Sequence, residues 1–304
     1  MTILKHIKHN EIDFTKWDQT ILSSEFPFVF AQSYYLNATS PGWEALIIGD
    51  YESVFPLTIK TKFGYKYLTQ PPFTSQLGAF GKLNLETELL FYYYIIKNFT
   101  LIDLELNYSN QLKNEFISPK KTYILNYKNN FQFNKNTKRN ITKAQNSGLL
   151  VQNVFGTDVL LLSQQYINPF LKEEIHLSDK TIKLLDNLLI NAQKAQQVFT
   201  FKVIDDNGNI KALGHFLSNG IHALYLKGVV LDRNENLGSM HLLIKHAIEY
   251  FADKSILFDF SGGSKKGLGG FYEGFGGEEM CYGFLQINSL PKLLKLLKLL
   301  KNKK

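Results

Sequence analysis

The chain has 304 residues, of which 44% are hydrophobic, 20% are charged and 14% are aromatic. This composition excludes an intrinsically disordered chain, and the length favours two domains, or one large α/β unit, over a single small core. The formal net charge of +7 favours an anionic partner, and a phosphorylated molecule, RNA and a membrane surface all agree with it.

The N-terminal segment and the hydropathy of the chain indicate a cytoplasmic protein. Residues 1–14 alternate between polar and apolar types and have no continuous apolar core of the kind a signal peptide needs. The densest apolar run, residues 89–96, is too short to span a bilayer. Cys281 is the only cysteine, so no disulfide can form within the chain, and a reducing compartment fits.

Hydrophobic periodicity predicts alternating strands and helices in the first half of the chain. The expected strands are residues 2–8, 43–48, 53–61 and 100–106, and the expected helices are residues 10–22, 31–38 and 85–98. The strands at 43–48 and 53–61 are expected to pair around Gly49-Asp50. A basic helix, NKNTKRNITKAQNSG at residues 134–148, then joins this half to the next.

The second half repeats a similar order of elements. The expected strands are residues 149–154, 198–205, 209–217, 221–230, 256–260 and 278–286, and the expected helices are residues 157–171, 179–195, 237–252 and a short one near 270. Asn207-Gly208 and Asn219-Gly220 predict hairpin turns in which both residues have positive φ. LIDL at residues 101–104 matches LFDF at residues 257–260, so we expect two related halves that join near residue 135.

The order β-α-α-β-β-β-α-β-α-β in the second half is that of the GNAT fold, and the duplication resembles the FemAB-like acyltransferases. Two segments carry this resemblance. Residues 134–148 are similar to the family's K-x-x-R-R-N-I-x-K-A-x-x-x-G helix, although Lys138 stands where arginine is commoner. Residues 256–284 resemble the segment whose D-F-x-G strand end and F-Y-x-x-F-G helix wall the acceptor pocket.

The resemblance implies a fold and an organisation into domains. The expected class is α/β with mixed sheets, in two tandem GNAT-like domains at residues 1–134 and 135–288. A basic amphipathic helical tail at residues 289–304 is expected to follow. From Pro291 onward its leucines centre on one side, and Lys292, Lys295 and Lys298 lie on the opposite side. This tail could dock on the protein's own surface, bind an anionic membrane peripherally or contact a partner helix.

The resemblance also implies transfer of an acyl or aminoacyl group to an amine on an anionic acceptor, such as a small molecule or a glycan precursor, with a cell-envelope role in view. No tightly bound cofactor is expected, and the donor is aminoacyl-tRNA or acyl-CoA. The segment from Glu235 to Met240 departs from the pyrophosphate-binding loop of acetyl-CoA-dependent GNAT enzymes, since glutamate repels pyrophosphate and methionine crowds the turn. Arg233 could compensate in part.

The distance between two predicted strands bears on the tRNA donor. Residues 154–198 leave no room for the long helical hairpin that several tRNA-using members insert. Both donors therefore stay open, with tRNA as one candidate partner. The rival functions are an acyl-CoA-dependent GNAT acetyltransferase and a catalytically inactive, membrane-peripheral binding protein.

Three residues are the catalytic candidates under this resemblance. Asp259, at the end of a central strand, could orient or deprotonate the amine, and Tyr272 or Tyr225 could protonate the leaving group. The alternatives are a carboxylate that braces a loop and tyrosine rings that are simply packed. His215 and His222, on neighbouring strands, are expected to be ordinary satisfied histidines, and no metal site is predicted.

The candidates for binding the substrate are all cations. The helix at the join could cradle phosphate oxygens with side chains that cluster loosely on one side, or simply expose a solvated face. Two lysines in the glycine-rich turn could close over an anion, or be only solvated. The candidate residues are Lys138, Arg139, Lys143, Lys227, Lys265 and Lys266.

Overall fold

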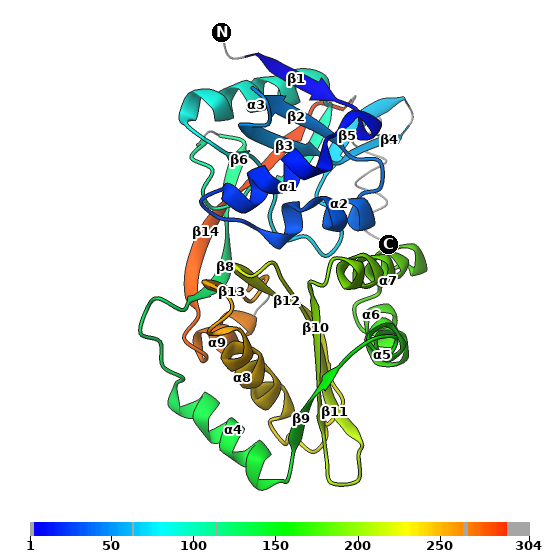
Figure 1. Ribbon diagram of the computed structural model, residues 1–304, viewed down its shortest axis with the longest axis vertical. Helices are drawn as coiled ribbons and strands as arrows, with labels where there is room; N and C mark the ends of the chain where they lie inside the picture. The colour runs from blue at the N-terminus through cyan, green and yellow to red at the C-terminus, as the bar shows by residue number, and fades with distance from the viewer. Residues whose placement is uncertain (1–2, 63, 114, 264–266, 291–304) are drawn as a thin grey trace. The chain divides into compact units, whose positions relative to one another are not determined.

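The computed structural model describes residues 3–62, 64–113, 115–263 and 267–290, and its elements are labelled in Figure 1. Contacts divide the chain into two compact units. Unit 1 comprises residues 1–25, 42–120 and 282–304, and unit 2 comprises residues 26–41 and 121–281. Each predicted domain, 1–134 and 135–288, is one continuous stretch of chain. Each compact unit instead combines segments from both predicted domains. The domain boundaries therefore stay a prediction about the duplicated halves.

Unit 1 contains two groups of strands and the helices that cover them. The order β1-β2-β3-β6 is formed by β1 (Leu4–Ile7), β2 (Glu44–Ile48), β3 (Ser53–Leu57) and β6 (Phe80–Gly81). The order β4-β5-β7-β14 is formed by β4 (Ile59–Lys62), β5 (Tyr65–Thr69), β7 (Leu101–Glu105) and β14 (Glu278–Asn288). The helices are η1 (His9–Glu11), α1 (Phe14–Ser23) and α3 (Leu85–Asn98).

Helix α3 shows why the stronger patterns were predictable. The side chain of Asn84 caps it by accepting a hydrogen bond from the Thr87 N–H, and the two residues form a capping box. Phe91 and Ile95, one turn apart, are buried in the core of unit 1. The predicted bounds, residues 85–98, are confirmed, and so is the pairing of β2 with β3.

Unit 2 is built around one mixed sheet in the order β8-β13-β12-β11-β10-β9. Only β12 and β13 run parallel; the other neighbours are antiparallel. The strands are β8 (Ile117–Asn126), β9 (Leu150–Val154), β10 (Val198–Ile204), β11 (Ile210–Ser218), β12 (His222–Val230) and β13 (Leu257–Asp259). The helices are η2 (Val29–Ala31), α2 (Ser33–Thr39), α4 (Lys135–Asn146), α5 (Asp158–Leu162), the π-helical turn η3 (Ser163–Ile167), α6 (Asn168–Glu173), α7 (Asp179–Lys194), α8 (Ser239–Phe251) and α9 (Leu268–Glu273).

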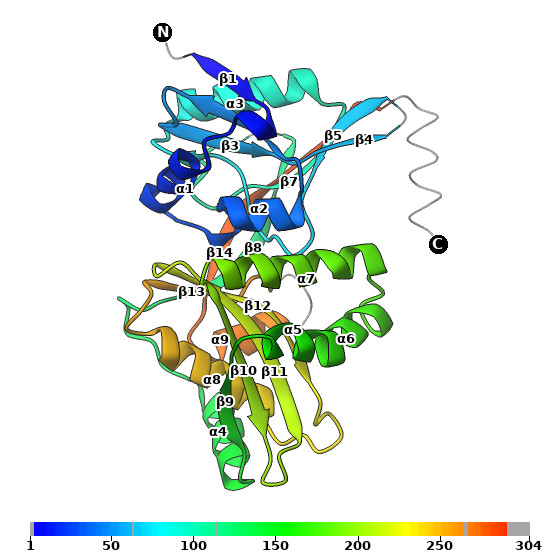
Figure 2. The ribbon, with the colours of Figure 1, turned by 45° about the vertical axis from the view of Figure 1, so that its right-hand side comes forward.

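The two faces of the unit 2 sheet meet different helices. Figures 1 and 2 show α8 on one side of the strands and α5, α6 and α7 on the other. Phe201, Phe216 and Phe258 point to the α8 side and form a core with Phe251 of that helix. Because side chains alternate along a strand, the residues between them face α7, η2 and η3. The predicted mixed α/β class is thus confirmed.

Both predicted Asn-Gly hairpins form, but their turns differ from the prediction. Positive φ is confined to Gly208 (80°) and Gly220 (85°), so the expectation for Asn207 and Asn219 was wrong. In each loop a side-chain carbonyl or carboxylate oxygen, from Asp205 or from Asn219 itself, accepts backbone N–H bonds. These side chains brace longer turns in which only the glycine must be left-handed.

Some elements were missed or misplaced. The strands β5, β6 and β8 were not predicted. In β8, Pro119 and two lysines in the first half are residue types that are uncommon in a central strand. The expected strand at 53–61 is interrupted at Thr58, whose hydroxyl donates to the carbonyl of Thr69. The expected helix at 10–22 begins only at Phe14, because Asp13 caps it.

Candidate active site

The candidate site lies where two parallel strands part. His222 of β12 is opposite Leu257 of β13, and Leu224 is opposite Asp259, the last residue of β13. Strand β12 continues to Val230, so beyond Leu224 its edge no longer has β13 beside it. A carboxylate therefore stands at the point where two parallel strands part.

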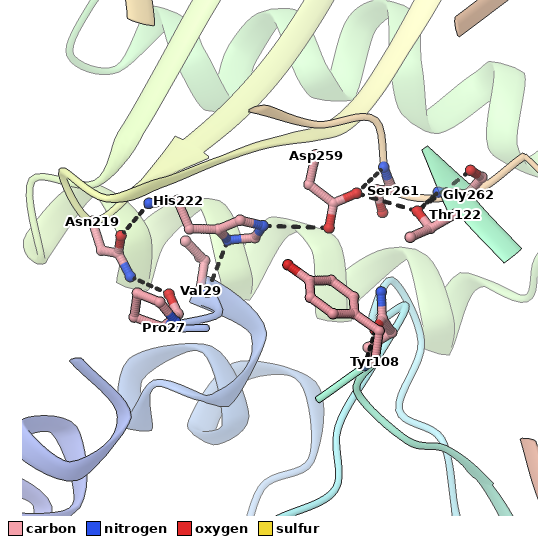
Figure 3. A network of polar contacts seen from close by, with 10 residues as sticks. Pro27, Val29, Tyr108, Thr122, Asn219, His222, Asp259, Ser261 and Gly262 are labelled. Atoms are coloured by element: carbon pink, nitrogen blue, oxygen red, sulfur yellow. Dashed lines mark hydrogen bonds and ion pairs between the residues drawn. The ribbon is translucent and has the colours of Figure 1, made fainter. Parts of the chain in front are cut away.

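Asp259 is fully buried and accepts three hydrogen bonds, as Figure 3 shows. One carboxylate oxygen accepts from the backbone N–H of Ser261 at 2.7 Å and from the hydroxyl of Thr122 at 3.3 Å. The other lies 3.3 Å from Nε2 of His222. A buried carboxylate needs such donors, because desolvation without them is costly. Asp259 is thus the centre of a satisfied polar network.

The tautomer of His222 follows from its second partner. Its Nδ1 lies 3.2 Å from the backbone N–H of Val29, which can only donate. Nδ1 is therefore the acceptor, and Nε2 carries the hydrogen that points to Asp259. The rings of Phe28 and Phe30 lie 5.0 and 5.9 Å from the imidazole, so its orientation is fixed by packing as well.

Asn219 ties the network to the segment 26–41, which belongs to the same compact unit. Its side chain accepts from the backbone N–H of His222 at 2.9 Å and donates to the carbonyl of Pro27 at 2.8 Å (Figure 3). The turn after β11 thus holds both the start of β12 and the chain before η2. The imidazole is positioned from two directions.

The chain turns sharply after Asp259. Ser261, Gly262 and Gly263 have φ values of 55°, 138° and 132°, all in the region that favours glycine. A β-carbon at Gly263 would lie 2.3 Å from the ring of Tyr123, so this position must be glycine. Ser261 is strained, and the bond from its N–H to Asp259 offsets that cost. Glycine thus lets the backbone pass close to an aromatic ring here.

The two tyrosine candidates lie on the other face of the sheet. Tyr225 follows Leu224, so its ring points to the α8 side, where its hydroxyl lies 3.7 Å from the sulfur of Met240. Tyr272 stacks on Phe260 with 4.7 Å between ring centroids. Burial raises the pKa of Tyr225. Burial and the charge of Asp259 raise the pKa of Tyr272 to about 12. Both phenols keep their protons at neutral pH.

The cations of α4 are only partly available. Lys138 and Arg139 are exposed, and Arg139 donates to the side chain of Asn136 one turn away at 2.8 Å. Lys143 instead donates to the backbone carbonyl of Asn236 at 2.6 Å. Lys227, on β12, lies opposite His215 and shares the sheet face of Asp259. Lys265 and Lys266 lie outside the described residues, and so does the predicted tail from residue 291 onward.

The start of α8 is packed against α4 and has a carboxylate beside it. Gly238 has a φ of 81°, and a β-carbon there would lie 2.4 Å from the carbonyl oxygen of Asn140 in α4. The buried carboxylate of Asp232 accepts from the hydroxyl of Ser239, the first residue of α8, at 2.8 Å. Arg233 forms an ion pair with Glu174 at 2.7 Å. A negative charge already occupies this helix N-terminus, where pyrophosphate would otherwise bind.

The two strand histidines have different surroundings. His215 shares a hydrogen bond of 2.8 Å with the hydroxyl of Thr200 through Nδ1, and burial lowers its pKa to about 3. His222 has a partner at each ring nitrogen, as expected of a satisfied histidine, whereas Nε2 of His215 is buried without a hydrogen-bond partner among the described residues, so the expectation was wrong there. Sequence reasoning also missed Thr122 and Asn219 as members of the network. The parallel order of β12 and β13 was a usable signal for His222, since it brings residues near 222 beside Asp259.

The part of the chain that the structure describes contains no set of three or more His, Cys, Asp or Glu placed to hold a metal ion. Over the same residues, no helix is both long enough and apolar enough to cross a membrane.

The repeated α/β halves and the diverging parallel strands define a FemAB-like fold of the GNAT type. No family model and no curated protein sequence match the chain. Among solved structures, FemX matches with a TM-score of 0.69 at 12% identity, over 96% of this chain and 99% of that one. L-PGS from Bacillus licheniformis matches with a TM-score of 0.55 at 9% identity, over 86% and 88% of the two chains. A tandem GNAT protein from the clavulanic acid biosynthesis pathway matches with a TM-score of 0.51 at 8% identity, over 95% and 100%. At these identities the likeness shows the fold, and it confirms the predicted fold class.

Proposed function

We propose that this protein is an N-acyltransferase that moves an acyl or aminoacyl group to an amine on an anionic acceptor. In this reaction the amine nitrogen bonds to the acyl carbon, the bond from that carbon to the donor breaks, and the amine proton passes to the leaving group. The observation that carries the proposal is the buried pair of Asp259 and His222 where β12 and β13 part. Fixed polar groups at the point where two parallel strands part are suited to hold a reacting carbonyl and an amine.

Of the two roles considered for Asp259, we assign it the orienting one. The side chain has no exposed surface and its three partners in Figure 3 are donors, so it is bound in place rather than open to an incoming proton. It holds His222 and the turn after β13 in place. Tyr225 and Tyr272 point to the opposite face and support the core there. Lys227 is a candidate contact for the acceptor on the face of Asp259.

We favour an aminoacyl-tRNA donor over acyl-CoA. The main support is the start of α8, where α4 packs closely and Asp232 supplies a negative charge. An acyl-CoA would have to place its pyrophosphate against that charge. The net charge of +7 and the exposed Lys138 and Arg139 agree with a polyanionic partner.

Transfer assays with the purified full chain test this proposal. Aminoacyl-tRNA and acetyl-CoA, each with a labelled acyl group, are offered with a panel of amines on phosphorylated and glycan-precursor carriers. We expect labelled amide from aminoacyl-tRNA, and a loss of about 100-fold or more in the Asp259→Ala variant. The matched control is Asp103→Ala, which changes the corresponding carboxylate in the other half.

Each result has a distinct meaning. Transfer from acetyl-CoA alone would support the acyl-CoA-dependent alternative. No transfer from either donor, together with vesicle binding that is lost when residues 290–304 are deleted, would favour the membrane-peripheral binding protein. Equal losses in the Asp259 and Asp103 variants would contradict the role given to Asp259.

A further inference from the structure

Unit 2 contains a cavity at the edge of its sheet that lies farthest from β8. Strand β9 ends at Val154, which pairs with Thr200, whereas β10 begins two residues earlier at Val198. The cavity, of about 270 Å³, lies in the slot where β9 would have continued. Its wall is formed by Asn153, Val154, Phe155, Gly156, Val159, Gln193, Gln196, Val198, Phe199, Thr200, Phe201 and Tyr250.

The cavity is separate from the site at Asp259. Strand β10 is three positions from β13 in the sheet, which corresponds to about 14 Å at the usual spacing between strands. No residue of the Asp259 network lines it. A ligand here would therefore be an additional one, and its presence does not depend on the proposed acyl transfer.

None of the lining side chains is charged, although the chain as a whole carries a net charge of +7. The polar side-chain groups are the carboxamides of Asn153, Gln193 and Gln196 and the hydroxyls of Thr200 and Tyr250. The hydroxyl of Thr200 is already bonded to His215, so the three carboxamides and the Tyr250 hydroxyl remain for a ligand. Each can both donate and accept, as the hydroxyl groups of a sugar do. The wall thus selects an uncharged ligand with many hydrogen-bonding groups.

Aromatic rings supply the rest of the wall. Phe155 is 73% exposed, an unusual position for a ring that lines a cavity. Phe199 and Phe201 lie 5.6 and 5.2 Å from Tyr250, ring centroid to ring centroid, and form the inner side. The C–H face of a sugar ring packs on such rings, while its hydroxyl groups reach the amides.

Gln196 occupies a backbone position that normally belongs to glycine. It directly follows the C-cap residue of α7, Ala195, and has a φ of 56°. The N–H of Gln196 donates to the carbonyl of Gln193, and the N–H of Gln197 donates to the carbonyl of Ala192. Together these two bonds form a Schellman motif. Glycine would relieve the strain there. The carboxamide of Gln196 on the cavity wall gives a reason for keeping a side chain at this position.

We propose that this cavity binds one uncharged pyranose ring, which stacks on the exposed ring of Phe155 and bonds to the carboxamides of Asn153, Gln193 and Gln196. A flat nucleobase would also stack on an aromatic ring. It has fewer hydrogen-bonding groups, however, with which to reach three carboxamides that come from separate segments of the chain.

Saturation-transfer NMR and calorimetric titration with the full chain test the proposal. The probes are methyl β-D-glucopyranoside and N-acetyl-D-glucosamine, with D-glucuronate as the charged comparison and adenosine as the flat one. We expect binding of the neutral sugars, and about a tenfold weaker affinity in both Gln196→Gly and Phe155→Ala, since each removes one contact. Gln196→Gly should at the same time raise the melting temperature, which separates lost binding from lost folding. Leu161→Ala, a change of a 57% exposed leucine outside the cavity wall, is the control and should bind as the wild type does.

The proposal is overturned if neither neutral sugar binds, or if both cavity variants bind as well as the wild type. Binding of adenosine in place of the sugars would also overturn it and assign the cavity to a flat base.

Discussion

Replacing Asp259 with asparagine keeps the size of the side chain but leaves a mismatch in the buried network. If the amide oxygen stays near the N–H of Ser261, the new NH2 group faces the Nε2–H of His222, and two donors oppose each other. If the amide turns over, the NH2 group faces the N–H of Ser261 instead. His222 cannot change tautomer to accept, because its Nδ1 already accepts from Val29 at 3.2 Å.

One buried donor is therefore left without an acceptor in either orientation, which costs about 1–3 kcal/mol. We expect Asp259→Asn to lower the free energy of unfolding by that amount. Urea denaturation followed by circular dichroism measures this change, through the shift of the midpoint at constant slope.

A double-mutant cycle with His222→Phe isolates the cause. Phe28 and Phe30 already surround the imidazole, so a phenyl ring meets aromatic neighbours there. In that background no Nε2–H opposes the amide, and Asp259→Asn should cost less, with a coupling energy of about 1 kcal/mol or more. The reasoning fails if the two effects add to within about 0.5 kcal/mol, because the residues would then act independently.

Three further changes test the surroundings of the site. Gly263→Ala should destabilise the protein by more than about 1 kcal/mol in urea denaturation, because φ is 132° and the new methyl group would meet the ring of Tyr123. Gly238→Ala should have a similar cost by pressing on the carbonyl of Asn140, and proteolysis should then release α4 sooner. His215 has a lowered pKa of about 3 when folded against 6.5 when unfolded, so the unfolded chain binds the proton first as pH falls. Stability should therefore drop between pH 6.5 and about 3, by up to about 1.4 kcal/mol per pH unit from this residue, and His215→Gln should show a shallower pH dependence. Identical pH profiles for the two proteins would contradict this assignment.

The strongly periodic elements were predictable because they carry their own signals. Helix α7 has a serine cap and regularly spaced buried leucines, and the predicted range 179–195 differs from Asp179–Lys194 by one residue. The place of Asp259 at the end of an apolar strand was also predictable, since the strand 256–260 has a strong apolar pattern. These features depend on residues close together in the sequence.

The network around Asp259 depends on residues far apart in the sequence. Thr122 lies 137 positions from Asp259, and Val29 lies 193 positions from His222. They meet because β8 pairs with β13 and because residues 26–41 join unit 2. No local pattern marks either event: β8 begins with a proline and lysines, and the segment before η2 has no periodicity. Pairing over such distances is set by the whole fold, and local sequence patterns do not contain that information.

The matching tetrapeptides LIDL and LFDF show that one local pattern can have two outcomes. Asp259 is fully buried among three donors, whereas Asp103 on β7 is partly exposed and accepts from the side chain of Gln286 at 3.1 Å. Water can satisfy a partly exposed carboxylate, so the surroundings of Asp103 need not be specific. The surroundings of Asp259 must be specific, because this carboxylate is fully buried. The duplication therefore repeats the strand arrangement in both halves, whereas the fully buried carboxylate of unit 2 also needs a specific set of hydrogen-bond donors. This difference is why Asp103 is the informative control for Asp259: the two changes are chemically identical, and only one removes a fully buried carboxylate.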